Sequence, residues 1–121
     1  MNSGDAKDAF QALYDVYVES YRQRDAAGCA SIFAEDAGLY SPFGPPAIGR
    51  AAIEAVHRDW VDEDGAEAKR IDVVDCGQEG DVGWCFAEYG EGAGVEGVSL
   101  NALARQANGS WLIARCSLNE V

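Results

Sequence analysis

The sequence predicts an α+β domain, because helical and strand patterns occupy separate halves of the chain. In the first half, up to about residue 62, apolar residues recur at three- and four-residue steps on either side of a proline-rich stretch, as in amphipathic helices. From about residue 68 they alternate with polar residues, and glycine-rich turns separate the segments, as in antiparallel hairpins. Three helices are therefore expected to cover one face of a curved, mostly antiparallel sheet.

The first helix is predicted over residues 8–24. Its apolar stripe consists of six residues: Phe10, Leu13, Tyr14, Tyr17, Val18 and Tyr21. Asp25 is placed to cap a second, shorter helix over residues 26–33, because an aspartate side chain accepts hydrogen bonds from the free N–H groups of a first turn. A third helix, over residues 50–62, has one face made of Ile53, Val56, His57 and Trp60.

Four strands are expected in the second half, over residues 71–74, 82–89, 95–105 and 111–118. The last two are joined by Asn108-Gly109, a strong hairpin signal because both residues tolerate positive φ. Side chains alternate between the two faces of a strand, so alternate residues share a face. The groups expected to share a face are Val82, Trp84, Phe86 and Glu88 in the strand over 82–89; Ser99, Asn101 and Leu103 in that over 95–105; and Leu112, Ala114, Cys116 and Leu118 in that over 111–118.

Length and charge limit the functional classes. At 121 residues the chain is expected to form one domain, residues 1–121. The formal net charge of −12 repels nucleic acids and anionic membrane surfaces, so neither is expected as a partner. The chain has no apolar run of the roughly 20 residues that cross a bilayer, and its first ten residues lack a signal-peptide pattern. A cytoplasmic location is therefore expected.

The four cysteines, Cys29, Cys76, Cys85 and Cys116, form no CxxC pair, and the single histidine has no neighbour at metal-ligand spacing. A zinc site is therefore not expected, and the residues imply no cofactor. Free cysteines in apolar patterns behave as small hydrophobic residues, so these are expected to be reduced core residues.

The stretch FAEDAGLYSPFGPPAIGR, residues 33–50, contains all three prolines of the chain and links two helical patterns. Gly44, Pro45 and Pro46 are turn residues, because proline fixes φ and glycine permits a sharp reversal. Ahead of them only a short extended piece is expected, over residues 38–40. The stretch is interpreted either as a connector between helices or as the rim of a pocket, with Ser41 in a catalytic position.

The pattern FAEDAGLYSPFGPPAIGRAAI is similar to the signature of the NTF2-like superfamily, particularly its SnoaL-like and ketosteroid isomerase-like branch. The order of the predicted elements matches that family along essentially the whole chain. The resemblance implies a cystatin-like cone, in which three N-terminal helices and a curved sheet enclose one deep apolar pocket, usually in a homodimer. This scaffold hosts isomerases, cyclases and dehydratases as well as binding modules.

Ketosteroid isomerases use a tyrosine and a protonated aspartate as hydrogen-bond donors to an enolate oxygen, while a second aspartate shuttles the proton. The resemblance places Tyr17 at the tyrosine position and Asn101 at that of the protonated aspartate, where an amide can still donate. The position of the base, directly before Pro42-Phe43-Gly44, holds Ser41. A serine hydroxyl does not abstract a carbon-bound proton without a neighbouring base.

His57 is the first candidate for a replacement base, because its ordinary pKa is near neutrality, and Glu88 is the second. The alternatives are a surface or interface position for His57, a solvated strand end for Glu88 and a core position for Tyr17. The wall of a pocket for a flat hydrophobic ligand is expected to consist of Phe43, Trp60, Trp84, Phe86, Leu103, Ala114, Cys116 and Leu118.

Three hypotheses for the function follow. The first is an isomerase, cyclase or dehydratase that acts on a small hydrophobic carbonyl compound. In it, Tyr17 and Asn101 polarise the carbonyl group, and the proton is moved by His57 or by a water held by Ser41. The second is a ligand-binding module without chemistry. The third is a homodimeric assembly module that pairs through the outer face of the sheet, where Trp111, Ile113 and Val95 are expected.

Overall fold

The computed structural model describes residues 3–121, with side chains from residue 5 onward. Residues 1 and 2, part of the segment searched above for a signal peptide, lie outside this range. Within it, no helix has both the length and the hydropathy that a membrane span requires. The elements are α1 (Ser3–Arg22), α2 (Ala26–Ala30), β1 (Phe33–Ser41), β2 (Gly44–Ile48), α3 (Arg50–Trp60), the 3₁₀ turn η1 (Ala66–Ala68), β3 (Lys69–Glu79), β4 (Val82–Glu91), β5 (Gly97–Arg105) and β6 (Trp111–Glu120).

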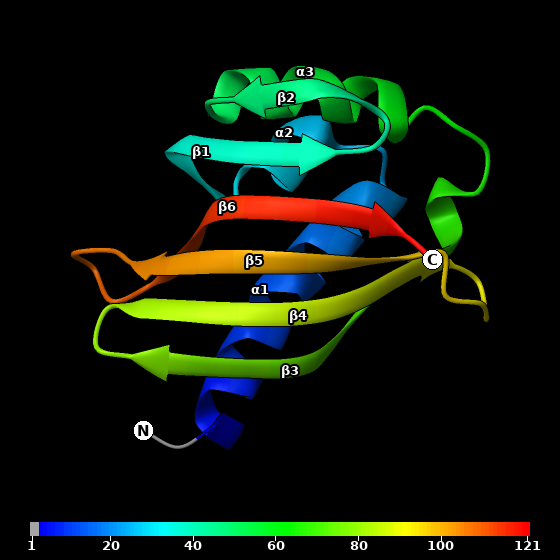
Figure 1. Cartoon of the computed structure of the whole chain (residues 1–121). Coiled ribbons are helices and arrows are strands. Elements are labelled where there is room, and N and C mark those ends of the chain that lie inside the picture. The colour runs from blue at the N-terminus through cyan, green and yellow to red at the C-terminus, as the bar shows by residue number, and fades with distance from the viewer. Residues whose placement is uncertain (1–2) are drawn as a thin grey trace.

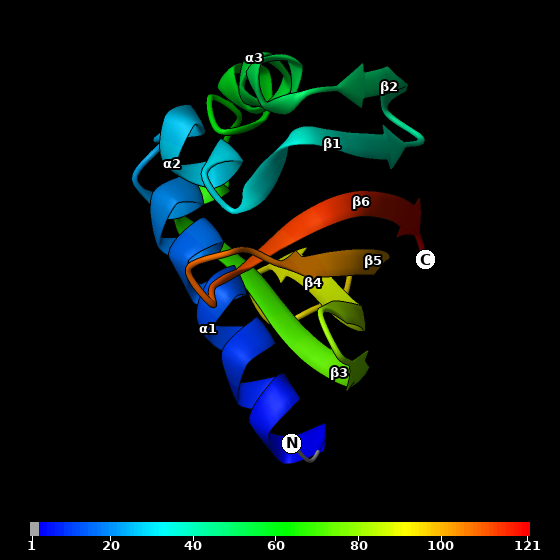
Figure 2. The same cartoon turned by 90° about the vertical axis from the view of Figure 1, so that its left-hand side faces the viewer.

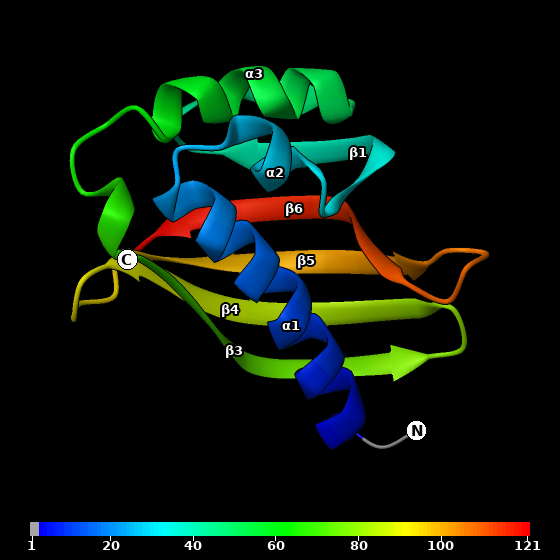
Figure 3. The same ribbon diagram turned by 180° about the vertical axis from the view of Figure 1, so that it is seen from behind.

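The strands form one six-stranded sheet in the order β2-β1-β6-β5-β4-β3 (Figure 1). Only the β1–β6 pair is parallel among the described strands, and the other four pairs are antiparallel. The sheet curves, as the edge view in Figure 2 shows, and α1 crosses its back from β3 towards α2 and α3 (Figure 3). The predicted α+β class, with helices packed against one face of a curved and mostly antiparallel sheet, is confirmed.

The first half differs from the expected one between residues 33 and 50. This stretch is a pair of strands, β1 and β2, and not a connector with a short extended piece. β1 is held on both sides, because Leu39 pairs with Ala47 of β2 and with Cys116 of β6. Pro45 and Pro46 lie in β2, an edge strand, where a residue without an N–H group is tolerated. The prolines were therefore misread as a turn.

The helices agree with the apolar stripes, but their ends differ. The α1 stripe is buried or half-buried throughout, as predicted. Asp25 caps α2 as expected, since its carboxylate accepts a hydrogen bond from the Gly28 N–H at 3.0 Å. α2 ends at Ala30, and Phe33 belongs to β1 because its backbone pairs with Ile113 of β6.

A β-bulge in β6 overturns the predicted alternation of that strand. Ala102 pairs with Arg115 and Leu103 with Ile113, so Ala114 is the extra residue between them. Consequently Ile113 and Cys116 lie on the same inner face, although three positions separate them. Ile113 and Trp111 are buried, and neither lies on the outer face where the assembly hypothesis placed them.

The contact between α1 and the sheet is centred on Phe10, which is fully buried. Its ring lies over Gly83 of β4, where an added Cβ would come within 2.6 Å of Phe10 Cζ. The ring also packs edge-to-face on Trp111, with 5.2 Å between centroids. Phe10 thus joins α1 to β4 and β6.

We expect Phe10→Ala to lower the free energy of unfolding by about 3–5 kcal/mol, the usual cost of emptying a buried phenylalanine site. Denaturant titration followed by circular dichroism measures the change. Val16→Ala on the exposed side of the same helix is the control and should have an effect below about 0.5 kcal/mol. Equal effects of the two substitutions would contradict this account of the core.

Candidate functional site

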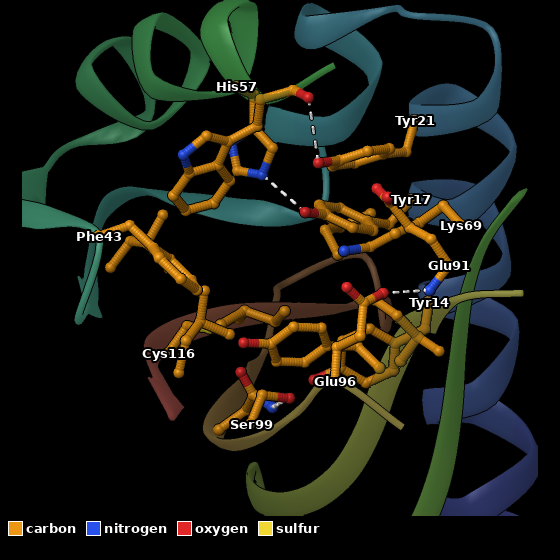
Figure 4. A pocket seen from close by; sticks show the side chains of 18 of the residues that line it. Tyr14, Tyr17, Tyr21, Phe43, His57, Lys69, Glu91, Glu96, Ser99 and Cys116 are labelled. Atoms are coloured by element: carbon orange, nitrogen blue, oxygen red, sulfur yellow. Dashed lines mark hydrogen bonds between the residues drawn. The ribbon is translucent and has the colours of Figure 1, made fainter. Parts of the chain in front are cut away.

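One pocket of about 700 Å³ lies between the helices and the inner face of the sheet (Figure 4). α1 contributes Tyr14, Tyr17 and Tyr21, which share one face because they are three, four and seven residues apart. α3 contributes His57 and Trp60. The strands and their ends supply Ile32, Phe33, Leu39, Phe43, Lys69, Ile71, Tyr89, Glu91, Ser99, Asn101, Ile113, Cys116 and Leu118.

The polar contact at the centre of this lining joins α1 to α3. His57 Nδ1 lies 2.7 Å from the Ile53 carbonyl oxygen, and His57 Nε2 lies 2.7 Å from the Tyr17 hydroxyl. A carbonyl oxygen only accepts, so Nδ1 carries the proton. In the neutral ring Nε2 is then an acceptor, and the Tyr17 hydroxyl donates to it. The Tyr17 proton is therefore directed at His57 and is not available to a ligand.

Burial sets the protonation of this pair. Desolvation lowers the pKa of His57 to about 4, although the hydrogen bond to the Ile53 carbonyl opposes the shift. Desolvation also raises the pKa of Tyr17 well above its ordinary value. His57 is 1% exposed, which excludes the surface position considered for it. At neutral pH the site thus holds a neutral imidazole bonded to a neutral phenol.

Asn101 lies in the pocket lining, but the amide nitrogen that was expected to donate to the ligand is engaged by the protein. Its Nδ2 donates to the Ser99 hydroxyl at 3.1 Å and to the Cys85 carbonyl at 3.4 Å. Its Oδ1 is buried without a hydrogen-bond partner among the described residues. Asn101 therefore offers an acceptor to a ligand, and the expectation of a donor is wrong.

A free donor comes from Tyr14, which the prediction placed only in the apolar stripe. Its hydroxyl is buried without a hydrogen-bond partner among the described residues, and it lies near the thiol of Cys85, a weak acceptor. Buried polar atoms in native proteins nearly always have partners, so an unoccupied donor and acceptor in one pocket indicate a binding site.

Seven of the predicted site residues line the pocket: Tyr17, Asn101, His57, Phe43, Trp60, Cys116 and Leu118. Phe43 and Trp60 pack edge-to-face, with 6.0 Å between ring centroids, and they bring the β1–β2 turn against α3. Phe43 remains 51% exposed, so it lies at the edge of the pocket.

Trp84, Phe86 and Glu88 do not line the pocket. The period-two reading grouped them on one face correctly, but that face of β4 is the outer one, and Trp84 is 46% exposed there. The inner face consists of Gly83, Cys85, Ala87 and Tyr89. Small residues are needed on this face because α1 packs against it, as the contact of Phe10 with Gly83 shows. The large side chains of β4 therefore lie on the outer face, the opposite of what was expected.

Ser41 and Leu103 also lie outside the pocket lining. Ser41 ends β1, and its Oγ accepts a hydrogen bond from the Phe43 N–H at 3.3 Å, so its role is in the turn. Leu103 is fully buried in the core next to its strand partner Ile113. Ala114 is displaced by the bulge and is absent from the lining as well.

Lys69 and Tyr89 are pocket residues that the sequence reasoning missed. Lys69 is the first residue of β3 and is only 8% exposed. The sequence did contain a signal for Lys69. It lies two residues before Ile71 and four before Val73, so in a strand all three side chains fall on the same face. It was missed because the strand was expected to begin only at residue 71.

Comparison with known proteins identifies the family and the fold of this chain. A family model, the SnoaL-like domain, matches residues 2–111. The chain belongs to the SnoaL-like family. No curated protein matches this SnoaL-like chain.

Solved structures confirm the fold of this SnoaL-like domain. A ketosteroid isomerase-like protein from Erwinia carotovora atroseptica is 16% identical, with a TM-score of 0.77 and 95% of each chain covered. ActVI-ORFA from Streptomyces coelicolor is 21% identical, with a TM-score of 0.64 over 93% of this chain and 95% of the other. An NTF2-like protein with a cystatin-like fold from Novosphingobium aromaticivorans is 22% identical, with a TM-score of 0.67 over 94% and 80%. The fold is therefore NTF2-like.

The depressed pKa of His57 predicts a specific pH dependence of stability. The unfolded chain, with an ordinary histidine pKa near 6.5, binds more protons than the folded one as the pH falls from about 7 towards 4. The contribution of neutral His57 to the free energy of unfolding is thus fully present above pH 7 and falls below it, by about 2 kcal/mol between pH 7 and pH 5.

Denaturant titrations of the wild type and of His57→Gln at several pH values between 5 and 7 measure this loss. Both proteins carry the same carboxylates, and His57 is the only histidine, so the difference between them isolates the imidazole. Parallel stability curves for the two proteins would mean that His57 is not held neutral.

Proposed function

We propose that this SnoaL-like domain binds a small, hydrophobic carbonyl compound and moves a proton within it, as an isomerase, cyclase or dehydratase of the ketosteroid isomerase-like kind. The hydrogen bond between Tyr17 and His57 in the pocket lining carries the proposal, because it joins a pocket-lining oxygen to the only imidazole of the chain. The pocket volume of about 700 Å³ and the aromatic lining support a flat, largely apolar ligand.

In this proposal the base is the Tyr17–His57 pair and not His57 alone. The Tyr17 proton is directed at Nε2, so a lone pair of the Tyr17 oxygen is free to accept a proton from the ligand while the tyrosine proton passes to His57. The electron pair of the broken C–H bond stays on the ligand as an enolate. A pKa of about 4 gives His57 the basicity of an ordinary carboxylate, the group that is missing at Ser41.

The two unoccupied polar atoms are assigned to the ligand. We place the Tyr14 hydroxyl as the donor to the enolate oxygen, where a positioned hydrogen bond stabilises developing charge. Asn101 Oδ1 is the acceptor for a hydroxyl group of the ligand. This exchanges the roles expected from the resemblance, since the donor comes from Tyr14 and Tyr17 belongs to the base.

Tyr17→Phe should lower the rate of proton transfer by about 10² or more, because it removes the oxygen that links the ligand to His57. Conversion of a β,γ-unsaturated cyclic ketone to its conjugated isomer, followed by ultraviolet absorbance, measures the rate. Ser41→Ala is the matched control and should leave the rate unchanged, because Ser41 does not line the pocket. A slow Ser41→Ala variant beside a fast Tyr17→Phe variant would overturn the assignment.

A ligand-binding module without chemistry is the second candidate. It is favoured by the fact that both ring nitrogens of His57 already have partners, as in a purely structural histidine. Exchange of deuterium from solvent into the position next to the carbonyl of a bound ketone separates the two. Binding with exchange supports an enzyme, and binding without exchange supports the module.

We further propose that a second copy of the chain covers the outer face of the sheet. Large apolar side chains are exposed there on three strands: Tyr40 on β1, Leu100 on β5, and Val82 and Trp84 on β4. A shallow groove lies between Tyr40, Trp84 and Leu100. In a chain with a net charge of −12, such a patch is more consistent with a covered surface than with a solvated one.

Leu100→Asp should dissociate such a homodimer, since it places a charge on each side of the apolar interface. Sedimentation equilibrium at micromolar concentration is expected to give twice 12.9 kDa for the wild type and 12.9 kDa for the variant. Val16→Asp, on the exposed side of α1, carries the same added charge and should remain dimeric. A monomeric wild type would overturn the dimer.

A cytoplasmic location is part of the proposal. The four cysteines are free and buried, which is typical of proteins from a reducing compartment.

A further inference from the structure

Lys69 is a buried amine that the proposed chemistry does not use. Its side chain extends from the start of β3 into the pocket (Figure 4). The backbone that carries it is fixed, because the Lys69 carbonyl accepts a hydrogen bond from Arg22 Nε at 2.8 Å and the residue pairs with Glu91 of β4. A long, flexible side chain is thus anchored at its base and directed at the ligand space.

The amino group of Lys69 lies between two aromatic rings. Its nitrogen is 4.5 Å from the ring centroid of Tyr21 and 4.8 Å from that of Tyr89. The Tyr89 ring is itself held against Gly97, where an added Cβ would lie 2.2 Å from Tyr89 Cζ. No hydrogen bond or ion pair engages the Lys69 amino group within the described residues. All of its hydrogens remain available to a ligand.

The charges around the pocket decide which ligand suits this amine. Five carboxylates line the pocket together with Lys69: Asp59, Glu63, Glu91, Glu96 and Glu120. An anionic ligand would have to enter against this excess of negative charge, whereas a neutral one would not. Desolvation lowers the pKa of Lys69, although the charges of Glu91 and Glu96 oppose the shift. The carboxylates therefore favour a neutral ligand, and burial increases the fraction of Lys69 that is a free amine.

We propose that Lys69 forms an imine with the aldehyde or ketone carbonyl of the bound ligand. The evidence is the position of its amino group inside the pocket, where no hydrogen bond or ion pair from the described residues engages it. This inference rests on the proposed carbonyl ligand and adds a covalent step to it. A lysine is the residue that forms imines with carbonyl compounds, and it does so when its amine is neutral.

The step is balanced by the two partners alone. The Nζ lone pair attacks the carbonyl carbon, and the carbonyl oxygen takes up a proton to give a carbinolamine. The C–O bond then breaks, the oxygen leaves as water with both hydrogens of the amine, and a C=N bond remains. Once protonated, this imine withdraws electrons from the neighbouring carbon, so the proton transfer assigned to Tyr17 and His57 then gives an enamine in place of the enolate.

Trapping with a hydride reagent tests the proposal. The protein is incubated at neutral pH with 2-naphthaldehyde, a flat neutral aldehyde, and sodium cyanoborohydride, which reduces imines to stable amines. Intact-mass measurement and peptide mapping then locate the label. Lys7 is the only other lysine and is exposed on α1, so it serves as an internal control.

We expect Lys69 to be labelled faster than Lys7, because burial lowers the pKa of the Lys69 amine and because the pocket holds the aldehyde beside it. Lys69→Arg keeps the positive charge and should abolish the adduct at this position while leaving the labelling of Lys7 unchanged. Labelling of Lys7 as fast as that of Lys69 would overturn the proposal.

A second probe separates the failure of this proposal from the failure of the proposed function. 2-Naphthalenemethanol has the same shape but cannot form an imine, and shifts of the Trp60 indole signal in an NMR spectrum report its binding. If the alcohol binds and Lys69 is not labelled, the imine is wrong and the carbonyl pocket stands. If neither compound binds, both proposals are wrong.

Discussion

The desolvated contact between His57 and Tyr17 is the interaction on which the rest of the structure depends. His57 joins three elements, because its ring contacts Tyr17 and Tyr21 of α1 and Phe33 of β1 while its backbone belongs to α3. Burying an imidazole is unfavourable unless its nitrogens find partners. The Ile53 carbonyl and the Tyr17 hydroxyl supply both of them. The same two hydrogen bonds that make this burial tolerable also determine the tautomer, and with it the direction of the Tyr17 proton.

The pocket is built around that contact. The Tyr17–His57 contact ties α3 to α1, and the pocket lies between these helices and the sheet, with the unpartnered polar atoms of Tyr14 and Asn101 among its lining residues. The donor of Tyr14 and the acceptor of Asn101 are positioned by α1 and β5, and Lys69 enters from β3. Carboxylates at the pocket lining disfavour anions, which is consistent with the neutral carbonyl ligand proposed above. The proposals for the Tyr17–His57 pair, the unoccupied polar atoms and Lys69 share this one ligand class.

Much of the fold could be predicted from the sequence, because its long periodic segments determine element type. β2 was not predicted, because its two prolines are typical of a turn. Proline is compatible with a strand only at the edge of a sheet, and the sequence does not show that β2 lies there. The bulge at Ala114 could not be read from alternation, as it depends on pairing with β5. In the site, the resemblance led to Tyr17 and Asn101, but their hydrogen-bond directions depend on partners from other elements, His57 and Cys85. Sequence spacing carries no information about such long-range contacts.

The most direct test of this account is the tautomer of His57 in solution. A long-range ¹H–¹⁵N correlation spectrum of the histidine ring needs no assignment, because the chain has one histidine. At pH 7 we predict a protonated, pyrrole-type Nδ1 and an unprotonated Nε2 whose shift shows that it accepts a hydrogen bond, and Tyr17→Phe should move the Nε2 signal only. A ring protonated on both nitrogens at pH 7, or one protonated on Nε2, would contradict the account.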